Sequence, residues 1–253
     1  MDNYRYKYTF GGVTFEINSE APLAGEQNCE KFWTVSDAEA DYVISVAYTD
    51  SEENPVTKTE RDGNRITVYV SRKYASKIGP VRLLVSAKAA NVFPEQDGFI
   101  LHASYIVHEG RAILFTAPSG TGKSTQAEYW RQMRGAEIVN GDRVLITKRD
   151  GEFFANGIYV AGTSGICENV TAPIRNVVIL EQGEINEIVP LRPHELFLRI
   201  LCQCSFDMNS DEQYRKITAL VADLINTVPV SCYRCRLNPD SVEALERLLW
   251  KRI

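Results

Sequence analysis

The chain has 253 residues, of which 44% are hydrophobic and 24% charged, so it can form one large globular domain or two small ones. Its net charge of −5 and the lack of Lys/Arg-rich runs argue against a nucleic-acid partner. There is no apolar run of about 18 residues and no apolar signal core behind Met1, so we expect no membrane span and a cytoplasmic location.

The N-terminal third predicts β-structure. Residues 50–64 are polar and are interpreted as turn and solvent-exposed chain. Strands are predicted within 4–17, as a hairpin turned at Gly11-Gly12, and at 42–48 and 65–71. We therefore expect residues 1–78 to form a β-rich portion packed on an α/β core made by residues 79–253, the alternative being one continuous domain.

The core is predicted to begin with a helix over residues 80–93 and a strand over 99–107. The chain then turns at residues 108–111 into a second strand. His102 lies on the first of these strands, so its side chain could reach the end of the neighbouring strand, although a histidine in an apolar strand is more often a core residue. His108 lies at the hairpin turn and is expected to be exposed.

The segment Ala117–Thr125 reads APSGTGKST between an apolar strand and a helix, which is the setting of a phosphate-binding loop. Gly120 and Gly122 let the backbone curl around an anion. Lys123 can reach the β- and γ-phosphates, and the Ser124 hydroxyl can bind Mg²⁺. Ala117 replaces the first glycine, so this is a looser Walker A motif; the alternative is a glycine-rich turn with an exposed lysine. The predicted phosphate-contacting residues are Pro118, Ser119, Gly120, Thr121, Gly122, Lys123, Ser124 and Thr125.

An acid follows the next predicted strand. The helix over 124–134, with Ala127, Trp130 and Met133 inward, is expected to end at Gly135. A strand then returns beside the loop strand and ends at Asp142, whose carboxylate is expected to face Mg²⁺ or an attacking hydroxyl. Arg143 could offset phosphate charge or pair with Asp142. The predicted metal ligands are Ser124 and Asp142.

The remaining chain predicts further mixed α/β structure. A glycine-rich segment at 157–165 is interpreted as a mobile loop near the substrate. The six cysteines are interpreted as buried thiols, the alternative being a zinc site made by the pairs Cys202/Cys204 and Cys232/Cys235. The other elements are predicted as a hairpin at 144–155 turned at 149–151, strands at 177–180 and 228–237, and helices at 193–204, at 211–227 and after Asn238-Pro239.

Three features over residues 98–180 together resemble the HPr serine kinase family, whose nucleotide fold is shared with ATP-dependent phosphoenolpyruvate carboxykinase. They are His102 ahead of the loop, the sequence SGTGKS at 119–124, and the strand ending in Asp142. The resemblance implies a mixed-sheet α/β core, ATP and Mg²⁺ as cofactors, Asp142 as base or metal ligand, and a role for His102 near the transferred phosphoryl group. Gly141-Asp142 replaces the family's two adjacent aspartates, and residues 158–162 lack its Glu-Ile-Arg-Gly segment, so an acceptor other than HPr is expected.

These observations predict a Mg²⁺-dependent, ATP-binding phosphotransferase that acts on a hydroxyl of a small protein, a peptide or a small molecule. The residues expected to carry the reaction are Asp142, His102 and Arg143. Two alternatives remain: a catalytically weak nucleotide-binding module with a regulatory or assembly role, and a hydrolase that uses the same site with water.

Overall fold

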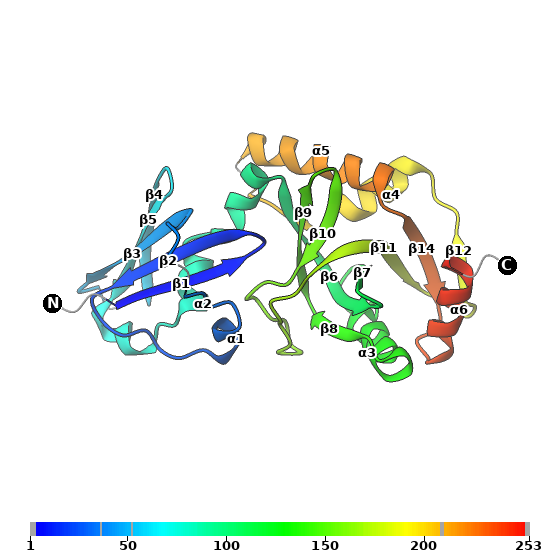
Figure 1. Ribbon diagram of the computed structural model, residues 1–253, viewed down its shortest axis with the longest axis horizontal. Coiled ribbons are helices and arrows are strands. Elements are labelled where there is room, and N and C mark those ends of the chain that lie inside the picture. Colours follow the sequence, from blue (N-terminus) through cyan, green and yellow to red (C-terminus); the bar gives the residue numbers. More distant parts are fainter. Residues whose placement is uncertain (1–3, 36, 52, 208–209, 251–253) are drawn as a thin grey trace. The chain divides into compact units, whose positions relative to one another are not determined.

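The computed structural model describes residues 4–35, 37–51, 53–207 and 210–250 and divides into two units, Met1–Val92 and Phe93–Ile253 (Figure 1). The division falls later than the boundary expected after residue 78. As a result, α2 (Pro80–Ser86) belongs to the first unit. Of the helix predicted over 80–93, only the part that α2 covers is confirmed as α-helix. A separate 3-10 helix follows at Ala89–Gln96.

The first unit is built on a mixed sheet with the strand order β1-β2-β3-β5-β4. The hairpin and the two strands predicted here are confirmed, but the interpretation of residues 50–64 as turn is wrong, because they contain β4. This edge strand is exposed along nearly its whole length, so it carries no apolar alternation, and it is held by backbone pairing to β5. The elements are β1 (Tyr4–Phe10), β2 (Val13–Ser19), α1 (Gln27–Glu30), β3 (Tyr42–Thr49), β4 (Val56–Asp62) and β5 (Arg65–Ser71).

Aromatic rings fill the core of this unit. Phe15 stacks between Phe10 and Tyr42, with ring centroids 5.0 and 5.5 Å away, and Phe32 meets Phe10 edge-on at 6.2 Å. Such pairs add about 0.5–1.5 kcal/mol each beyond the area that they bury. The alternation of β2 places Val13, Phe15 and Ile17 on this inner face.

The second unit contains a larger mixed sheet with the order β10-β9-β6-β7-β11-β14-β12, to which β8 and β13 add by pairing with β6. Strands β7, β11 and β14 run parallel, and the other pairs are antiparallel, so the predicted mixed α/β class is confirmed. The strands are β6 (Gly98–His108), β7 (Arg111–Thr116), β8 (Glu137–Asn140), β9 (Arg143–Arg149), β10 (Glu152–Asn156), β11 (Thr171–Gln182), β12 (Glu187–Val189), β13 (Cys204–Ser205) and β14 (Val230–Cys235).

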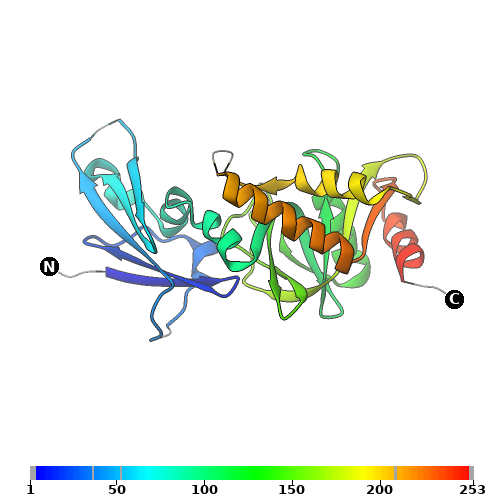
Figure 2. The ribbon, with the colours of Figure 1, turned by 90° about the horizontal axis from the view of Figure 1, so that it is seen from above.

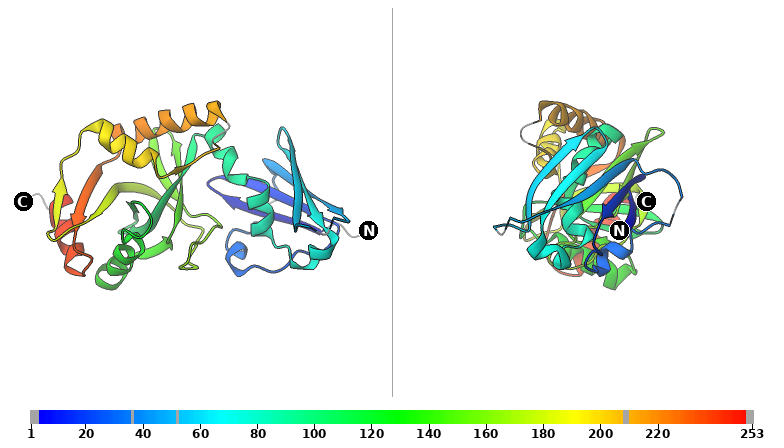
Figure 3. Two further views of the ribbon diagram at one scale, coloured as in Figure 1. Left: turned by 180° about the vertical axis from the view of Figure 1, so that it is seen from behind. Right: turned by 90° about the vertical axis from the view of Figure 1, so that its left-hand side faces the viewer.

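Helices cover both faces of this sheet (Figures 2 and 3). Helices α4 and α5 bury Ile200, Val221 and Leu224 in one hydrophobic core, whereas α3 and α6 bury Trp130 and Leu245 in the other. The bounds are α3 (Lys123–Arg134), α4 (Pro193–Leu201), α5 (Asp211–Thr227) and α6 (Asp240–Leu249). The helix predicted over 193–204 ends at Leu201 in the structure, so its predicted C-terminal end is wrong.

The strand before Asp142 is placed differently from the prediction. β8 pairs with β6 and not with the loop strand β7, whose neighbours are β6 and β11. The prediction that this strand returns beside the loop strand is therefore wrong. β6 is long enough to pair with β9 along its first half and with both β7 and β8 along its second half, which brings all three strands to one region.

Trp130 is the centre of the α3 core. Its fully buried ring makes edge contacts with His108 and Trp250, at centroid distances of 5.4 and 5.5 Å. The expectation that His108 is exposed is wrong, because its ring packs on Trp130. Met133 was predicted to point inward but is 36% exposed. Arg134 lies on the side of α3 that faces α6 instead, where its guanidinium pairs with Glu246 at 2.9 Å.

The cysteines are mostly buried thiols, as predicted, but Cys202 is exposed and Cys204 lies in β13 rather than in a helix. Among the residues that the structure describes, no three His, Cys, Asp or Glu side chains gather where they could hold a metal ion. In the same residues, no helix is both long and apolar enough to cross a membrane.

We expect Trp130→Ala to lower the free energy of unfolding by about 3–5 kcal/mol, because it removes a fully buried ring from a closed core. Met133→Ala, on the exposed side of the same helix, should change it by less than about 0.5 kcal/mol. Urea denaturation followed by circular dichroism measures both values. Equal losses in the two variants would contradict this assignment of the buried face.

Candidate phosphate-binding site

The loop between β7 and α3 has a backbone that only glycine adopts readily. Gly120 and Gly122 have φ angles of 81° and 107°. A side chain at Gly122 would also lie 2.5 Å from Leu237, which packs directly over it. The two glycines singled out in the sequence therefore shape the loop as expected.

Helix α3 begins at this loop with free backbone donors. Its first internal hydrogen bond runs from Gln126 N to Gly122 O, at 2.9 Å, so the N–H groups of residues 123–125 have no acceptor within the helix. In the described chain no side chain caps them. Such an end carries partial positive charge and favours an anion.

A cavity of about 280 Å³ lies at this helix start. It is lined by Ser119, Gly120 and residues 122–125 of the loop, together with His102, Gly141, Asp142 and Thr163. The structure thus brings six of the eight predicted loop residues to one cavity with His102 and Asp142. Pro118 and Thr121 line a different cavity, on the side of the loop that faces the end of β11.

Lys123 is held inside the loop. It is only 7% exposed, and its ammonium donates to the carbonyls of Ala117 and Pro118 at 2.8 and 3.2 Å. Burial lowers the pKa of Lys123, and the negative charge of Asp142 opposes this shift. An ammonium paired with neutral carbonyls in a partly desolvated cavity can exchange them for a charged acceptor, which makes a stronger bond.

His102, Asp142 and Arg143 meet because β6 pairs with β9. His102 is opposite Arg143 in the register, and the His102 Nδ1 atom lies 3.4 Å from Asp142 Oδ1. The other carboxylate oxygen lies 3.4 Å from Arg143 Nε. Burial lowers the pKa of His102, with further lowering by Lys123 and Arg143 and an opposing effect of Asp142. The net lowering favours the neutral imidazole, which can donate one hydrogen bond.

Asn140 positions the acid, and sequence reasoning did not select it. Its fully buried side chain accepts from the N–H groups of Asp142 and Arg143 at 2.9 and 3.0 Å, and donates to the carbonyls of Ile158 and Val160. The amide thus fixes the turn before β9 and ties it to the following loop. The Asn140-Gly141 pair, a common turn dipeptide, was the available signal.

The segment 157–165 packs against this turn. A side chain at Gly162 would lie 2.5 Å from the Cβ of Asp142, and one at Gly141 would lie 2.4 Å from Ser164 Oγ. Thr163 reaches the cavity itself. The predicted nearness of this loop to the acid therefore has a structural basis, while its mobility stays a prediction.

Residues 81–249, more than half of the chain, match the family model described as SynChlorMet cassette protein ScmC. The chain belongs to this family. It is also similar to a solved structure, the HPr(Ser) kinase/phosphatase from Coxiella burnetii, with 11% identity, a TM-score of 0.33, and coverage of 59% of this chain and 92% of that one. This likeness is distant. No curated protein matches the chain.

We expect the imidazole of His102 to titrate below 6.5, and the two neighbouring charges to move its pKa in opposite directions. Lys123→Met removes a positive charge and should raise the pKa of His102, whereas Asp142→Asn removes a negative charge and should lower it. Proton NMR titration measures both, and His102→Gln assigns the signal. A shift of the same sign in both variants would contradict this arrangement of charges.

Proposed function

We propose that this chain binds Mg²⁺ and ATP at the loop 117–125 and transfers the γ-phosphoryl group to a hydroxyl of an acceptor. One observation carries the proposal. The uncapped start of α3, Lys123 and Asp142 line the same cavity of about 280 Å³. Phosphoryl transfer needs positioned positive charge and one acid that orients the nucleophile, and little else from the protein.

The chemistry of the cavity fits a phosphate tail. The N–H groups of residues 123–125 supply fixed donors, and Lys123 supplies a charge that neutral carbonyls now hold. A volume of about 280 Å³ lies just below the range of about 300–1,000 Å³ that ligand cavities span, which suits a chain of phosphates rather than a whole nucleotide.

The oxygen atoms at the cavity also fit a magnesium ion. Ser124 and Asp142 both line it, and hard cations prefer the hydroxyl and carboxylate oxygens that these side chains carry. When bound there, Mg²⁺ would offset charge on the β- and γ-phosphates. Ser124 Oγ now lies 3.3 Å from the Gly141 carbonyl, so the serine is already directed at the turn that carries the acid.

In the transfer step Asp142 accepts the proton of the acceptor hydroxyl while that oxygen bonds to the γ-phosphorus. The bond from phosphorus to the β–γ bridging oxygen breaks, and ADP leaves. Lys123 and the amides of residues 123–125 stabilise the charge that gathers on the phosphoryl oxygens. His102 and Arg143, on either side of Asp142, hold its carboxylate in place. Because the family description names a cassette protein, the other products of that cassette are the first acceptors to test.

We expect Lys123→Ala to weaken Mg·ATP binding at least tenfold in isothermal titration calorimetry, because a charge-assisted bond to phosphate is lost. Lys216→Ala removes an exposed lysine of α5 and serves as the matched control. If Lys123→Ala keeps the wild-type affinity while the protein stays folded, the proposed binding site is wrong.

Asp142→Asn separates the roles of the acid. If Asp142 is the base, the variant should keep its affinity for Mg·ATP and lose about 10²–10⁴-fold in transfer of radiolabelled γ-phosphate to a cassette product. If Asp142 is a metal ligand, the Mg²⁺-dependent part of the affinity falls as well. ATP binding without transfer to any cassette product, equally in wild type and variant, would favour the nucleotide-binding module instead.

A further inference from the structure

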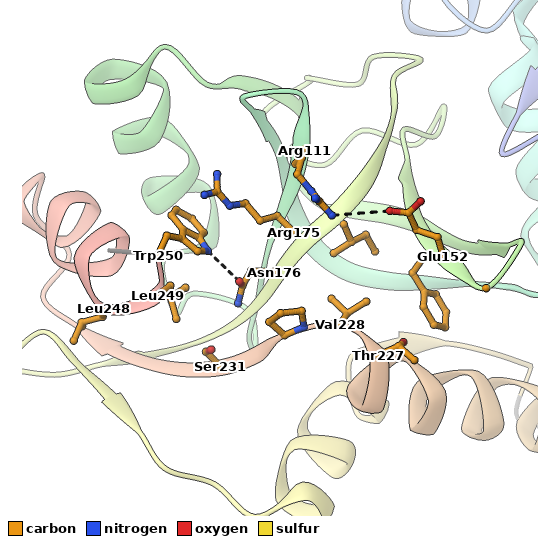
Figure 4. Close-up of a pocket in the computed structure, with 14 residues that line it drawn as sticks. Arg111, Glu152, Arg175, Asn176, Thr227, Val228, Ser231, Leu248, Leu249 and Trp250 are labelled. Atoms are coloured by element: carbon orange, nitrogen blue, oxygen red, sulfur yellow. Dashed lines mark hydrogen bonds and ion pairs between the residues drawn. The ribbon is translucent and has the colours of Figure 1, made fainter. Parts of the chain in front are cut away.

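A second cavity lies at the other end of the parallel strands from the phosphate-binding loop. It measures about 630 Å³, within the range of about 300–1,000 Å³ that ligand cavities span. β7 runs from Arg111, which lines this cavity, to Thr116, which leads into the loop. The ends of α5 and α6 complete the walls (Figure 4). The proposed transfer reaction uses none of these residues.

Asn176 brings an unsatisfied donor to this cavity. The residue is 3% exposed, and Trp250 Nε1 donates to its Oδ1 at 3.3 Å (Figure 4). An indole N–H can only donate, so this contact fixes which side-chain atom is oxygen. The amide nitrogen is then left buried without a hydrogen-bond partner among the described residues. Buried amides are nearly always paired with protein, water or a ligand, so the Asn176 nitrogen can donate to an oxygen that enters this cavity.

A β-bulge directs two adjacent side chains to the same place. Ile174 pairs with Ala112 and Asn176 with Ile113, which leaves Arg175 as the extra residue of β11. In a regular strand Arg175 and Asn176 would face opposite sides of the sheet. Here both contact Trp250: the Arg175 guanidinium lies 4.1 Å from the ring centroid, and Asn176 accepts its N–H. Bulges are frequent beside functional sites, where they re-aim side chains in this way.

The charges limit what the cavity can hold. Arg175 pairs with Glu109 at 3.0 Å, and Arg111 lies 3.9 Å from Glu152. Two cations are thus already balanced by two carboxylates, which disfavours a polyanion. A single carboxylate can displace one of these exposed glutamates from its arginine into solvent, and it adds only one negative charge to the site. Val228, Pro229 and Leu249 supply an apolar wall.

We propose that this cavity is a second ligand site, which takes a small amphipathic carboxylate. One carboxylate oxygen accepts from the Asn176 amide, the charge faces Arg111 and Arg175, and the apolar body lies on the wall made by Val228, Pro229 and Leu249. The site does not rest on the proposed transferase function. Its ligand is a free amino-acid-like acid or the C-terminus of a short peptide, which share this chemistry.

The test uses the full chain and NMR signals of the Trp250 indole N–H and the Asn176 amide. The probes are N-acetyl-L-leucine, its uncharged amide, N-acetyl-Gly-Gly-Leu and inorganic phosphate. We expect the acid to shift both signals and to bind at least tenfold tighter than its amide. Tighter binding of the tripeptide identifies a peptide terminus, and tighter binding of the single residue a free acid.

Variants show whether the binding occurs at this cavity. Arg111 has an exposed side chain, so Arg111→Gln should weaken the binding of N-acetyl-L-leucine without affecting the fold. Asn176→Asp keeps an acceptor for Trp250 but replaces the donor by a negative charge, and it should abolish binding. Lys123→Ala should leave binding unchanged, which also keeps the result independent of nucleotide binding. The proposal is overturned if neither signal shifts, if acid and amide bind equally, if phosphate binds best, or if Lys123→Ala removes the effect.

Discussion

The start of α3 imposes the constraint on which the candidate site depends. Residues 123–125 present backbone donors that the helix cannot satisfy, and the residue before them is a glycine without a capping side chain. The φ of 107° at Gly122 strains any other residue, and a Cβ there would lie 2.5 Å from the Leu237 side chain. The loop therefore keeps its donors directed at a cavity, and its own lysine is held by carbonyls within reach of that cavity.

The acid opposite these donors is held by a second set of contacts. Asn140 uses both ends of its buried amide, one to form the turn at Asp142 and the other to bind the segment after β10. The carbonyl of Asp142 accepts from Ala103 N, and the Gly141 carbonyl accepts from the buried Ser104 hydroxyl. These contacts fix the backbone at Asp142, and His102 and Arg143 lie 3.4 Å from its two carboxylate oxygens. An acid held in this way costs little further ordering when a substrate arrives, which is what a catalytic or metal-binding position requires.

Much of this arrangement could be predicted from the sequence, because its signals are local. Glycine spacing, apolar strands and the acid after β8 indicated the loop and its neighbours. The errors have a different origin. β4 is exposed and carries no periodicity, His108 packs on a tryptophan far along the chain, and β8 joins β6 through long-range pairing. The unpaired amide of Asn176 depends on a bulge whose register only the folded sheet reveals.

The two cavities lie at opposite ends of β7 and β11, and the sheet limits how they can influence each other. Between the bulge and the loop, Val177, Val178 and Ile179 of β11 pair with β7 on one side and β14 on the other. A shift of Asn176 along the strand would break bonds of both ladders before it reached Gln182, which donates to the carbonyls of Gly120 and Thr121. Coupling between distant sites requires an element with two arrangements, and a doubly paired strand resists having them. Ligands at the two ends should therefore bind independently.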